Sequence, residues 1–326
     1  MFLIEAISSH LAYKLIVVVL VAIFLLTVAS LFGNHLYLEL TTHFRIQYAL
    51  GAILCGALLL SFHSPRLLPI AVFCAVFNLA YLGPYLFSFK QPQLPASEVQ
   101  FRLLHANVLM TNRNYQELLT AVYEANADLV VLQEFTDEWR ENTRVLAREY
   151  PFVELAPRPG GSGMALLSRY PLTETRTLSL DTSGHVALIT RVELEGASVT
   201  ILGLHPPTPV GPARFANRNL QFKEAASILS SINGPRILVG DLNTTMWSPY
   251  FELLENDSGL RDARLGFGLK TSWPMPLPGF MRLPIDHCLV SKEVAVAGLR
   301  VGPRVGSDHR PLIVDLRLPS TKSSLD

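Results

Sequence analysis

Residues 236–243 read RILVGDLN, an apolar run that leads directly into an acid and an amide. The run has the composition of a short buried strand, and GDLN is typical of a turn that follows one. The same pattern recurs in LVVLQE at 129–134 and in PIDHCLVS at 284–291, where apolar runs meet acids or a histidine. Because rigid strand ends are where proteins often aim catalytic groups, this recurrence predicts a site at the edge of a sheet.

The rest of the soluble part predicts an α/β domain. Further apolar runs predict strands at 101–108, 164–167, 187–194, 198–204, 296–301 and 311–316. Helical spacing predicts helices at 114–125 and 214–232, and the second is followed by the stop signal NGP at 233–235. Strands and helices do not alternate strictly, which favours two packed sheets flanked by helices.

The first 90 residues contain three long runs without a charge, at 15–32, 46–62 and 67–89. A membrane-spanning helix needs roughly 17–25 mostly apolar residues, so each run is long enough. Soluble core helices rarely stay apolar on all faces over such lengths, and a cleaved signal peptide would explain only the first run. We therefore expect a three-helix transmembrane region at 1–90, which makes the chain a multi-pass integral membrane protein.

Beyond the spans, the stretch KQPQLPAS at 90–97 is typical of a short, stiff linker. We expect a linker at 91–98, a catalytic domain at 99–318 and a carboxyl-terminal tail at 319–326. Three spans place the two chain ends on opposite sides of the bilayer. The Lys and Arg residues near the spans are almost evenly divided, so the usual dominance of the first helix favours an inside amino terminus. This predicts an extracytoplasmic catalytic domain.

Composition excludes several classes of protein. Only 17% of the 326 residues are charged and the formal net charge is zero, which does not fit a disordered chain. Three cysteines are too few for a disulfide scaffold. Residues 91–326 carry 23 Lys and Arg against 25 Asp and Glu, a net charge of −2, so charge does not favour a nucleic-acid partner.

Eight polar residues stand at the ends of the predicted strands or in the turns beside them: Asn107, Glu134, His205, Asp241, Asn243, Asp286, Asp308 and His309. Each one alone has an ordinary explanation as a turn residue or a solvated group. Together they are the inventory of a metal-assisted phosphoester hydrolase. Carboxylates bind a hard cation such as Mg²⁺, a His–Asp pair serves as a base or an electrostatic partner, and amides and imidazoles donate to phosphoryl oxygens.

Several motifs together resemble a known superfamily. LQE at 132–134, GDLN at 240–243 and SDHRP at 307–311 are similar to signatures of the endonuclease/exonuclease/phosphatase superfamily, which has the DNase I-like fold; so are HANV at 105–108, PIDHCLVS at 284–291 and GSGMALLSRYP at 161–171. The resemblance covers about residues 99–318, and the motifs arrive in family order. It implies a four-layer α/β sandwich with two mixed β-sheets, here preceded by an α-helical transmembrane region.

The resemblance also implies a metal site. Glu134 would be the main ligand of Mg²⁺, or alternatively Mn²⁺, with Asn107 close by and Asp308 as a further acid on the metal side. Some nuclease members carry an acid two residues after the first Asn, where this chain has Leu109. That departure puts a second metal in doubt.

The same resemblance implies the catalytic roles. His309 would act as general base or face the phosphate, and Asp286 would orient it. Asp241 would position or deprotonate the attacking water, and Asn243 would hold a phosphoryl oxygen. His205 would lie on the opposite side of the phosphate. Outside the motifs, the three tryptophans are expected to be packing or rim residues, except that Trp247 follows the GDLN turn and could line the cleft.

Three functions are consistent with these features. The first is a membrane-anchored phosphodiesterase or phosphatase that acts on lipid-linked or other small phosphoesters near the bilayer. The second is a membrane-tethered nuclease acting on DNA or RNA. The third is a catalytically dead membrane scaffold, against which the complete set of motif residues argues. Protein partners, oligomeric state and the choice between diester and monoester are not determined by the sequence.

Overall fold

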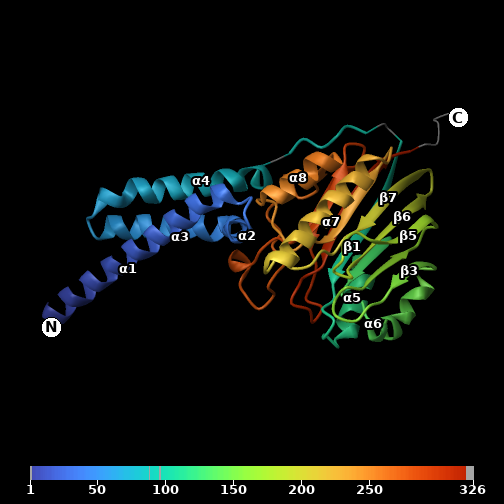
Figure 1. Ribbon diagram of the computed structural model, residues 1–326, viewed down its shortest axis with the longest axis horizontal. Coiled ribbons are helices and arrows are strands. Elements are labelled where there is room, and N and C mark those ends of the chain that lie inside the picture. The colour runs from blue at the N-terminus through green and yellow to red at the C-terminus, as the bar shows by residue number, and fades with distance from the viewer. Residues whose placement is uncertain (1, 88, 95–96, 321–326) are drawn as a thin grey trace.

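The computed structural model describes residues 2–87, 89–94 and 97–320, and it contains a helical bundle followed by an α/β domain (Figure 1). The bundle consists of α1 (Phe2–Ala29), η1 (Ser30–Phe32), α2 (Leu36–Glu39), η2 (Leu40–Phe44), α3 (Arg45–Ser61), η3 (Pro65–Leu67) and α4 (Leu68–Leu86). Residues 95–96 of the predicted linker and 321–326 of the predicted tail lie outside the described residues.

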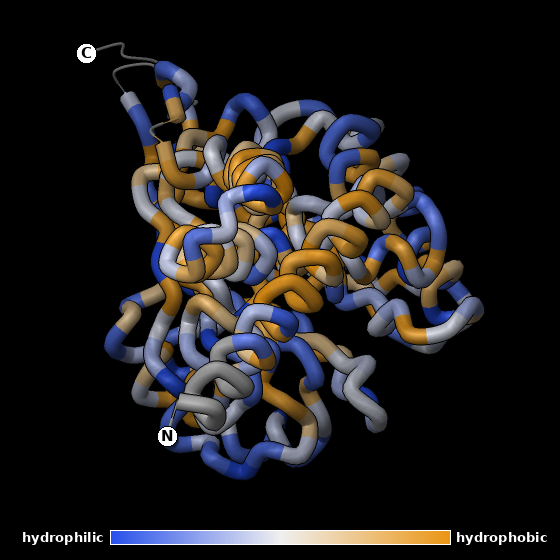
Figure 2. The backbone as a smooth tube through the Cα atoms, turned by 90° about the vertical axis from the view of Figure 1, so that its left-hand side faces the viewer, coloured by the Kyte–Doolittle hydropathy of each residue, from blue (hydrophilic) through white to orange (hydrophobic). Residues whose placement is uncertain are grey.

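The bundle has the length and composition of a membrane anchor. Three candidate spans, His10–Phe32, Leu36–Ser61 and Pro65–Leu86, overlap the three predicted runs. Large apolar side chains such as Leu15, Leu54 and Val76 are exposed on its outer surface, as expected of helices that face lipid. Figure 2 views the molecule from the bundle end, where much of the tube has the orange colour of hydrophobic residues.

The α/β domain contains two six-stranded mixed sheets. The first has the order β11 (Ala295–Val301), β12 (Leu312–Pro319), β1 (Glu98–Asn107), β2 (Leu129–Gln133), β4 (Met164–Ser168) and β3 (Phe152–Ala156). The second has the order β5 (Leu172–Ser179), β6 (Val186–Leu194), β7 (Ala197–Gly203), β8 (Arg236–Asp241), β10 (Asp286–Ser291) and β9 (Leu260–Asp262). In each sheet one central pair, β1 with β2 and β7 with β8, is parallel and the other pairs are antiparallel.

Helices cover the outer faces of both sheets. On one side lie α5 (Tyr115–Ala125), α6 (Asp137–Asn142) and η4 (Arg144–Arg148); on the other lie α7 (Pro212–Ser230) and α8 (Pro249–Ser258), while η5 (Gly279–Met281) is in a later loop. Successive side chains of a strand point to opposite faces of its sheet, so each strand contributes to two apolar cores. In β1, Leu103 packs between the two sheets and Leu104 packs beneath the helices. The predicted four-layer α/β sandwich is therefore confirmed.

Three strands, β3, β5 and β9, escaped the sequence-based prediction, and all three are outermost strands of their sheets. Most side chains of β3 and β5 are exposed or half-buried, and β9 has only three residues. Such strands need no continuous apolar run, so hydrophobic patterning does not find them.

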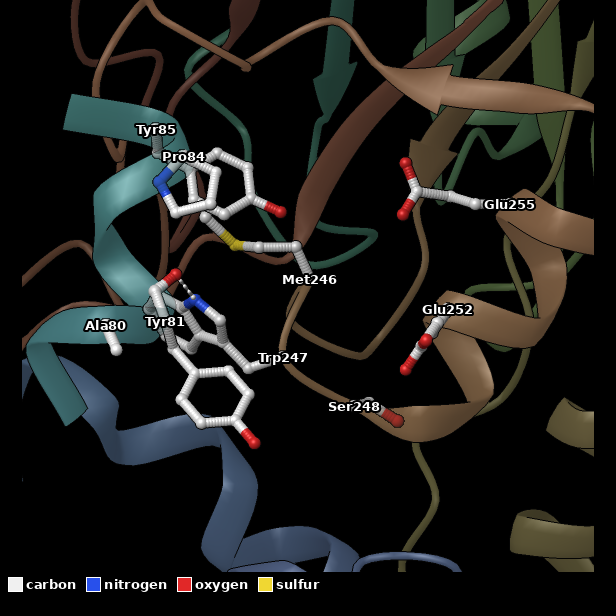
Figure 3. A pocket seen from close by; sticks show the side chains of 9 residues that line it. All are labelled: Ala80, Tyr81, Pro84, Tyr85, Met246, Trp247, Ser248, Glu252 and Glu255. Carbon is white, nitrogen blue, oxygen red and sulfur yellow. Dashed lines mark hydrogen bonds between the residues drawn. The ribbon is translucent and has the colours of Figure 1, made fainter. Parts of the chain in front are cut away.

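The bundle is docked on the domain rather than joined to it by a free linker. The amides of Gly266 and Gly268 donate to the carbonyls of Pro84 and Tyr85 at the end of α4, at 3.2 and 2.8 Å. The indole of Trp247 donates to the carbonyl of Tyr81 at 3.2 Å, beside a crevice of about 350 Å³ between α4 and α8 (Figure 3). Trp247 therefore belongs to this junction, and the prediction that it lines the catalytic cleft was wrong.

A buried ion pair joins the bundle to the domain. Glu39, at the end of α2, and Arg218, in α7, form a salt bridge in which neither side chain is exposed. The other carboxylate oxygen of Glu39 accepts a hydrogen bond of 2.5 Å from the hydroxyl of Ser248. Because each charge is stable out of water only beside its partner, the pair ties the position of α2 to that of α7.

Breaking this pair from one side should destabilise the protein. Glu39→Leu leaves Arg218 buried without its counter-charge, which costs roughly 3–5 kcal/mol. The double variant Glu39→Leu/Arg218→Met removes both charges and should recover most of the loss. Thermal unfolding of the full chain in detergent measures both effects, and a double variant that melts as early as the single one would refute this account.

Candidate active site

The polar residues predicted at the strand ends gather at one edge of the sandwich. β1 ends at Asn107, and Glu134 follows β2 directly; β8 ends at Asp241. Asp286 begins β10, which runs antiparallel to β8 and pairs with it so that Asp286 faces Asp241 across the ladder. The two parallel pairs and this antiparallel neighbour therefore bring groups from both sheets to the same place.

Asp241 lies at the centre of the cluster. Its Oδ2 accepts a hydrogen bond from the Asn107 amide at 3.1 Å and lies 3.6 Å from the Nε2 atoms of both His205 and His309. Its Oδ1 accepts the backbone N–H of Asn243 at 2.9 Å. Burial alone would raise the pKa of Asp241, but the positive charge on His309 outweighs it and holds the pKa below its usual value. Asp241 is therefore an ionised group in a buried site.

His309 is held by a buried carboxylate. Its Nδ1 lies 2.9 Å from Oδ2 of Asp286, whose other oxygen is 3.0 Å from Nε2 of His105. Burial lowers the pKa of His309, but the carboxylates of Asp286 and Asp241 outweigh it and raise the pKa to about 10. The reciprocal attraction holds the pKa of Asp286 well below its usual value, although burial opposes this. The arrangement keeps His309 cationic and fixes its ring.

His105 is a site residue that sequence analysis missed. It is fully buried and contacts the carboxylate oxygen of Asp286 that His309 does not. The sequence does contain an indication of this role, because His105 lies two residues before Asn107 on β1 and residues i and i+2 of a strand lie on the same face. A histidine in the middle of an apolar strand reads as core, which hid its role.

Glu134 offers the best placed carboxylate for a cation. Its backbone has a φ of 58°, and its two oxygens accept hydrogen bonds of 3.0 Å from the Asn107 amide and the N–H of Met110. The oxygen of the Asn107 amide accepts the N–H of Leu109, so Asn107 presents its NH₂ group to the site. Asn107 thus orients Glu134 and Asp241 in this structure.

This donor set fits Mg²⁺ held mainly by one carboxylate. Within residues 2–87, 89–94 and 97–320, no three His, Cys, Asp or Glu side chains are arranged to hold an ion. Mg²⁺ usually keeps several waters and takes one or two carboxylates together with substrate oxygens, so it does not need such a cage. Glu134, already oriented by two donors and open to the cavity, meets that requirement.

Asp308 and Asn243 both line the cavity and are held by different partners. Oδ2 of Asp308 accepts the indole N–H of Trp273 at 3.0 Å, a contact that sequence analysis did not foresee. The Asn243 amide donates to the carbonyl of Pro206 at 3.0 Å and accepts the hydroxyl of Thr208 at 3.2 Å. Asn243 is thereby tied to the loop that follows His205.

Gln133 and Gly240 bring the two sheets close together next to the site. Gln133 accepts the N–H of Asp241 at 2.8 Å and donates to the carbonyl of Leu204 at 2.9 Å. A Cβ at Gly240 would lie 2.0 Å from the Leu204 oxygen, so only glycine fits there. This close approach explains why glycine precedes Asp241 in the GDLN turn.

A cavity of about 870 Å³ opens over these groups, large enough for a small-molecule ligand. Its lining includes six of the eight predicted residues, namely Glu134, His205, Asp241, Asn243, Asp308 and His309. The other two, Asn107 and Asp286, lie behind it in direct contact with Asp241 and His309. The structure thus assembles all eight residues in one place; what each does there is a separate question.

Known structures resemble this chain in fold. An endonuclease/exonuclease/phosphatase from Beutenbergia cavernae matches with a TM-score of 0.54 at 18% identity over 68% of this chain and 72% of its own. D. rerio TDP2 complexed with a single-strand DNA product gives 0.57 at 15% identity over 67% and 98%. Sphingomyelinase C from Streptomyces griseocarneus gives 0.51 at 18% identity over 67% and 99%. No curated protein sequence matches the chain.

The sequence also matches a family model directly. The model of the Endonuclease/Exonuclease/phosphatase family covers residues 104–309, which is more than half of the chain and spans every predicted site residue. With the two mixed sheets and the assembled polar cluster, this match shows the relationship that the motifs predicted. The chain belongs to the endonuclease/exonuclease/phosphatase family.

Proposed function

We propose that this protein is a membrane-anchored, Mg²⁺-dependent enzyme that hydrolyses a phosphodiester or phosphomonoester. The observation that carries the proposal is the buried series Asp286–His309–Asp241 beside the oriented carboxylate of Glu134. An ionised acid and a cationic imidazole, both fixed before substrate arrives, are what attack by water on a phosphoryl group requires.

Five side chains take direct roles in this proposal. Glu134 would hold the Mg²⁺, which offsets negative charge on the phosphoryl oxygens. Asp241 accepts a proton from the attacking water as its oxygen joins phosphorus and the bond to the leaving oxygen breaks. His309 donates to a phosphoryl oxygen and is the nearest group able to return a proton to the leaving oxygen. Asn243 and His205 donate to the remaining oxygens.

Mutation of the central groups should abolish most activity. Asp241→Asn and His309→Ala should each lower kcat by roughly 10²–10⁴-fold, because each removes a proton-transfer or charge-stabilising group. Mg²⁺-dependent hydrolysis of bis(p-nitrophenyl) phosphate by the full chain in detergent measures this. Asp257→Asn, a change of the same kind at an exposed position of α8, is the control and should leave kcat unchanged. Full activity in His309→Ala would contradict the mechanism.

The metal role of Glu134 has its own test. Glu134→Gln should raise the Mg²⁺ concentration for half-maximal activity at least about tenfold. Mutation of residues that only hydrogen-bond to a metal ligand already lowers metal affinity by about that factor. Chelation with EDTA should abolish hydrolysis, and added Mg²⁺ should restore it. An unchanged Mg²⁺ requirement in Glu134→Gln would remove Glu134 from the metal site.

The charge of His309 predicts a distinct titration. In the metal-free protein its imidazole should titrate near pH 10 rather than near 6.5. Because the folded pKa is raised, the stability that the charge contributes is fully present below about pH 6.5 and is lost as pH rises through about 10. Asp286→Asn should lower the pKa. Histidine NMR measures both values, and a midpoint near 6.5 in the unmodified protein would contradict the ion pair.

A nuclease is the second candidate, since TDP2 bound to single-strand DNA shares the fold. Against it, Arg214 is the only Lys or Arg among the described residues that line the cavity. Binding to nucleic acid normally uses several cationic contacts to phosphates. Mg²⁺-dependent nicking of supercoiled plasmid that disappears in His309→Ala would favour the nuclease; its absence in a chain that hydrolyses the small diester would exclude it.

We also propose that the catalytic domain is extracytoplasmic. In Figure 1 the end of α1, the start of α3 and the end of α4 all meet the domain, so the amino terminus lies at the far end of the bundle. Alkaline phosphatase needs its disulfides to be active, and these form only outside the cytoplasm. Alkaline phosphatase fused to the carboxyl terminus should therefore be active, whereas a reporter that works only in the cytoplasm should be inactive there. The opposite pair of results would reverse the orientation.

A further inference from the structure

One wall of the active-site cavity comes from the membrane bundle. Leu40, His43 and Phe44, all in η2, line the same cavity as Asp241 and His309. η2 follows α2 and leads directly into α3, so this wall belongs to the first part of the second candidate span, Leu36–Ser61. The catalytic groups and the membrane anchor therefore share one cavity.

This wall is fixed to the catalytic turn. The Nδ1 atom of His43 lies 3.0 Å from the hydroxyl of Thr245, two residues beyond Asn243. Glu39, at the end of α2, binds Ser248 of the same loop and Arg218 of α7. A segment held by buried polar contacts on both sides is a built part of the site, not a linker that passes near it.

Apolar side chains of the η2 wall and of the loop that contains Val210 line the cavity. Phe44 is 39% exposed and Val210 is 65% exposed, and both line the cavity together with Leu40, Leu283 and Ile285. Large apolar side chains at a cavity otherwise built from acids, amides and imidazoles have no role in binding a phosphate. They suit a ligand that is charged at one end and apolar at the other.

The position of η2 in the bundle indicates that such a ligand comes from the membrane. Arg45 follows Phe44 directly and begins α3, so η2 lies at the domain end of the bundle, where lipid head groups of one leaflet would lie (Figure 1). Leu50, Ile53 and Leu54 in α3, the helix that follows Phe44, are also exposed. A lipid in that leaflet therefore has apolar surface of the bundle close to the cavity wall formed by Leu40 and Phe44.

We propose that the substrate is a lipid phosphoester taken from the adjacent leaflet, with its phosphate among Glu134, Asp241 and His309 and its apolar chain against Leu40 and Phe44. This inference rests on the proposed hydrolysis and adds the substrate class. The reaction is the same addition of water to phosphorus and loss of the leaving oxygen. The apolar wall selects lipids over soluble esters of equal reactivity.

The test compares two esters with one leaving group. The full chain in nanodiscs of dioleoylphosphatidylcholine is given methyl p-nitrophenyl phosphate or hexadecyl p-nitrophenyl phosphate with Mg²⁺. We expect kcat/KM to be at least about tenfold higher for the hexadecyl ester, since even one methylene in an apolar pocket is worth about tenfold. Phe44→Ser, and independently Val210→Ser in an exposed loop, should each reduce that ratio several-fold.

The control is Phe152→Ser on β3, where a phenylalanine of similar exposure, 37%, lies outside the cavity lining; it should leave the ratio unchanged. Equal hydrolysis of both esters by the unmodified chain would overturn the lipid inference and leave the proposed hydrolysis standing. A preference for the hexadecyl ester that neither Phe44→Ser nor Val210→Ser alters would also overturn the lipid inference. Hydrolysis of neither ester would overturn phosphodiester hydrolysis as the proposed activity, and the lipid inference that rests on it.

Discussion

The site depends on one interaction, the contact of the Asp286 carboxylate with two imidazoles. Asp286 is completely buried, and a carboxylate in that position is stable as an anion only if its oxygens meet partners. His105 meets one oxygen and His309 the other. The cost of burying Asp286 is therefore offset by fixing His309, and the positive charge of His309 in turn keeps Asp241 ionised. Three groups from different strands and loops hold one another in a defined charge state.

The two-sheet architecture is what makes that contact possible. His105 comes from the first sheet, and Asp286 begins β10 in the second, so the pair crosses the sandwich. Gln133 makes a second crossing, from the end of β2 to Asp241 and Leu204. At this edge of the sandwich the sheets are thus joined by polar groups, while the apolar layer between them supplies the stability on which those groups depend.

Local patterns predicted much of this structure. The apolar runs that end in Asn107, Gln133 and Asp241 predicted both the central strands and the convergence of the site. Two kinds of feature lay beyond them. The edge strands β3 and β5 carry no continuous apolar signal. His105, Trp273 and the Glu39–Arg218 pair act through partners distant in sequence, and such pairings depend on the fold rather than on neighbouring residues.

The bundle is an integral part of the candidate site, because η2 forms a wall of the cavity that Asp241 and His309 line and Glu39 holds the loop after the GDLN turn. In the proposed reaction water attacks phosphorus within that cavity, and hydrolysis of the hexadecyl ester in H₂¹⁸O shows which bond breaks. We expect ¹⁸O in the hexadecyl phosphate product and none in the p-nitrophenol. Label in the p-nitrophenol would mean attack at carbon, and would contradict the mechanism.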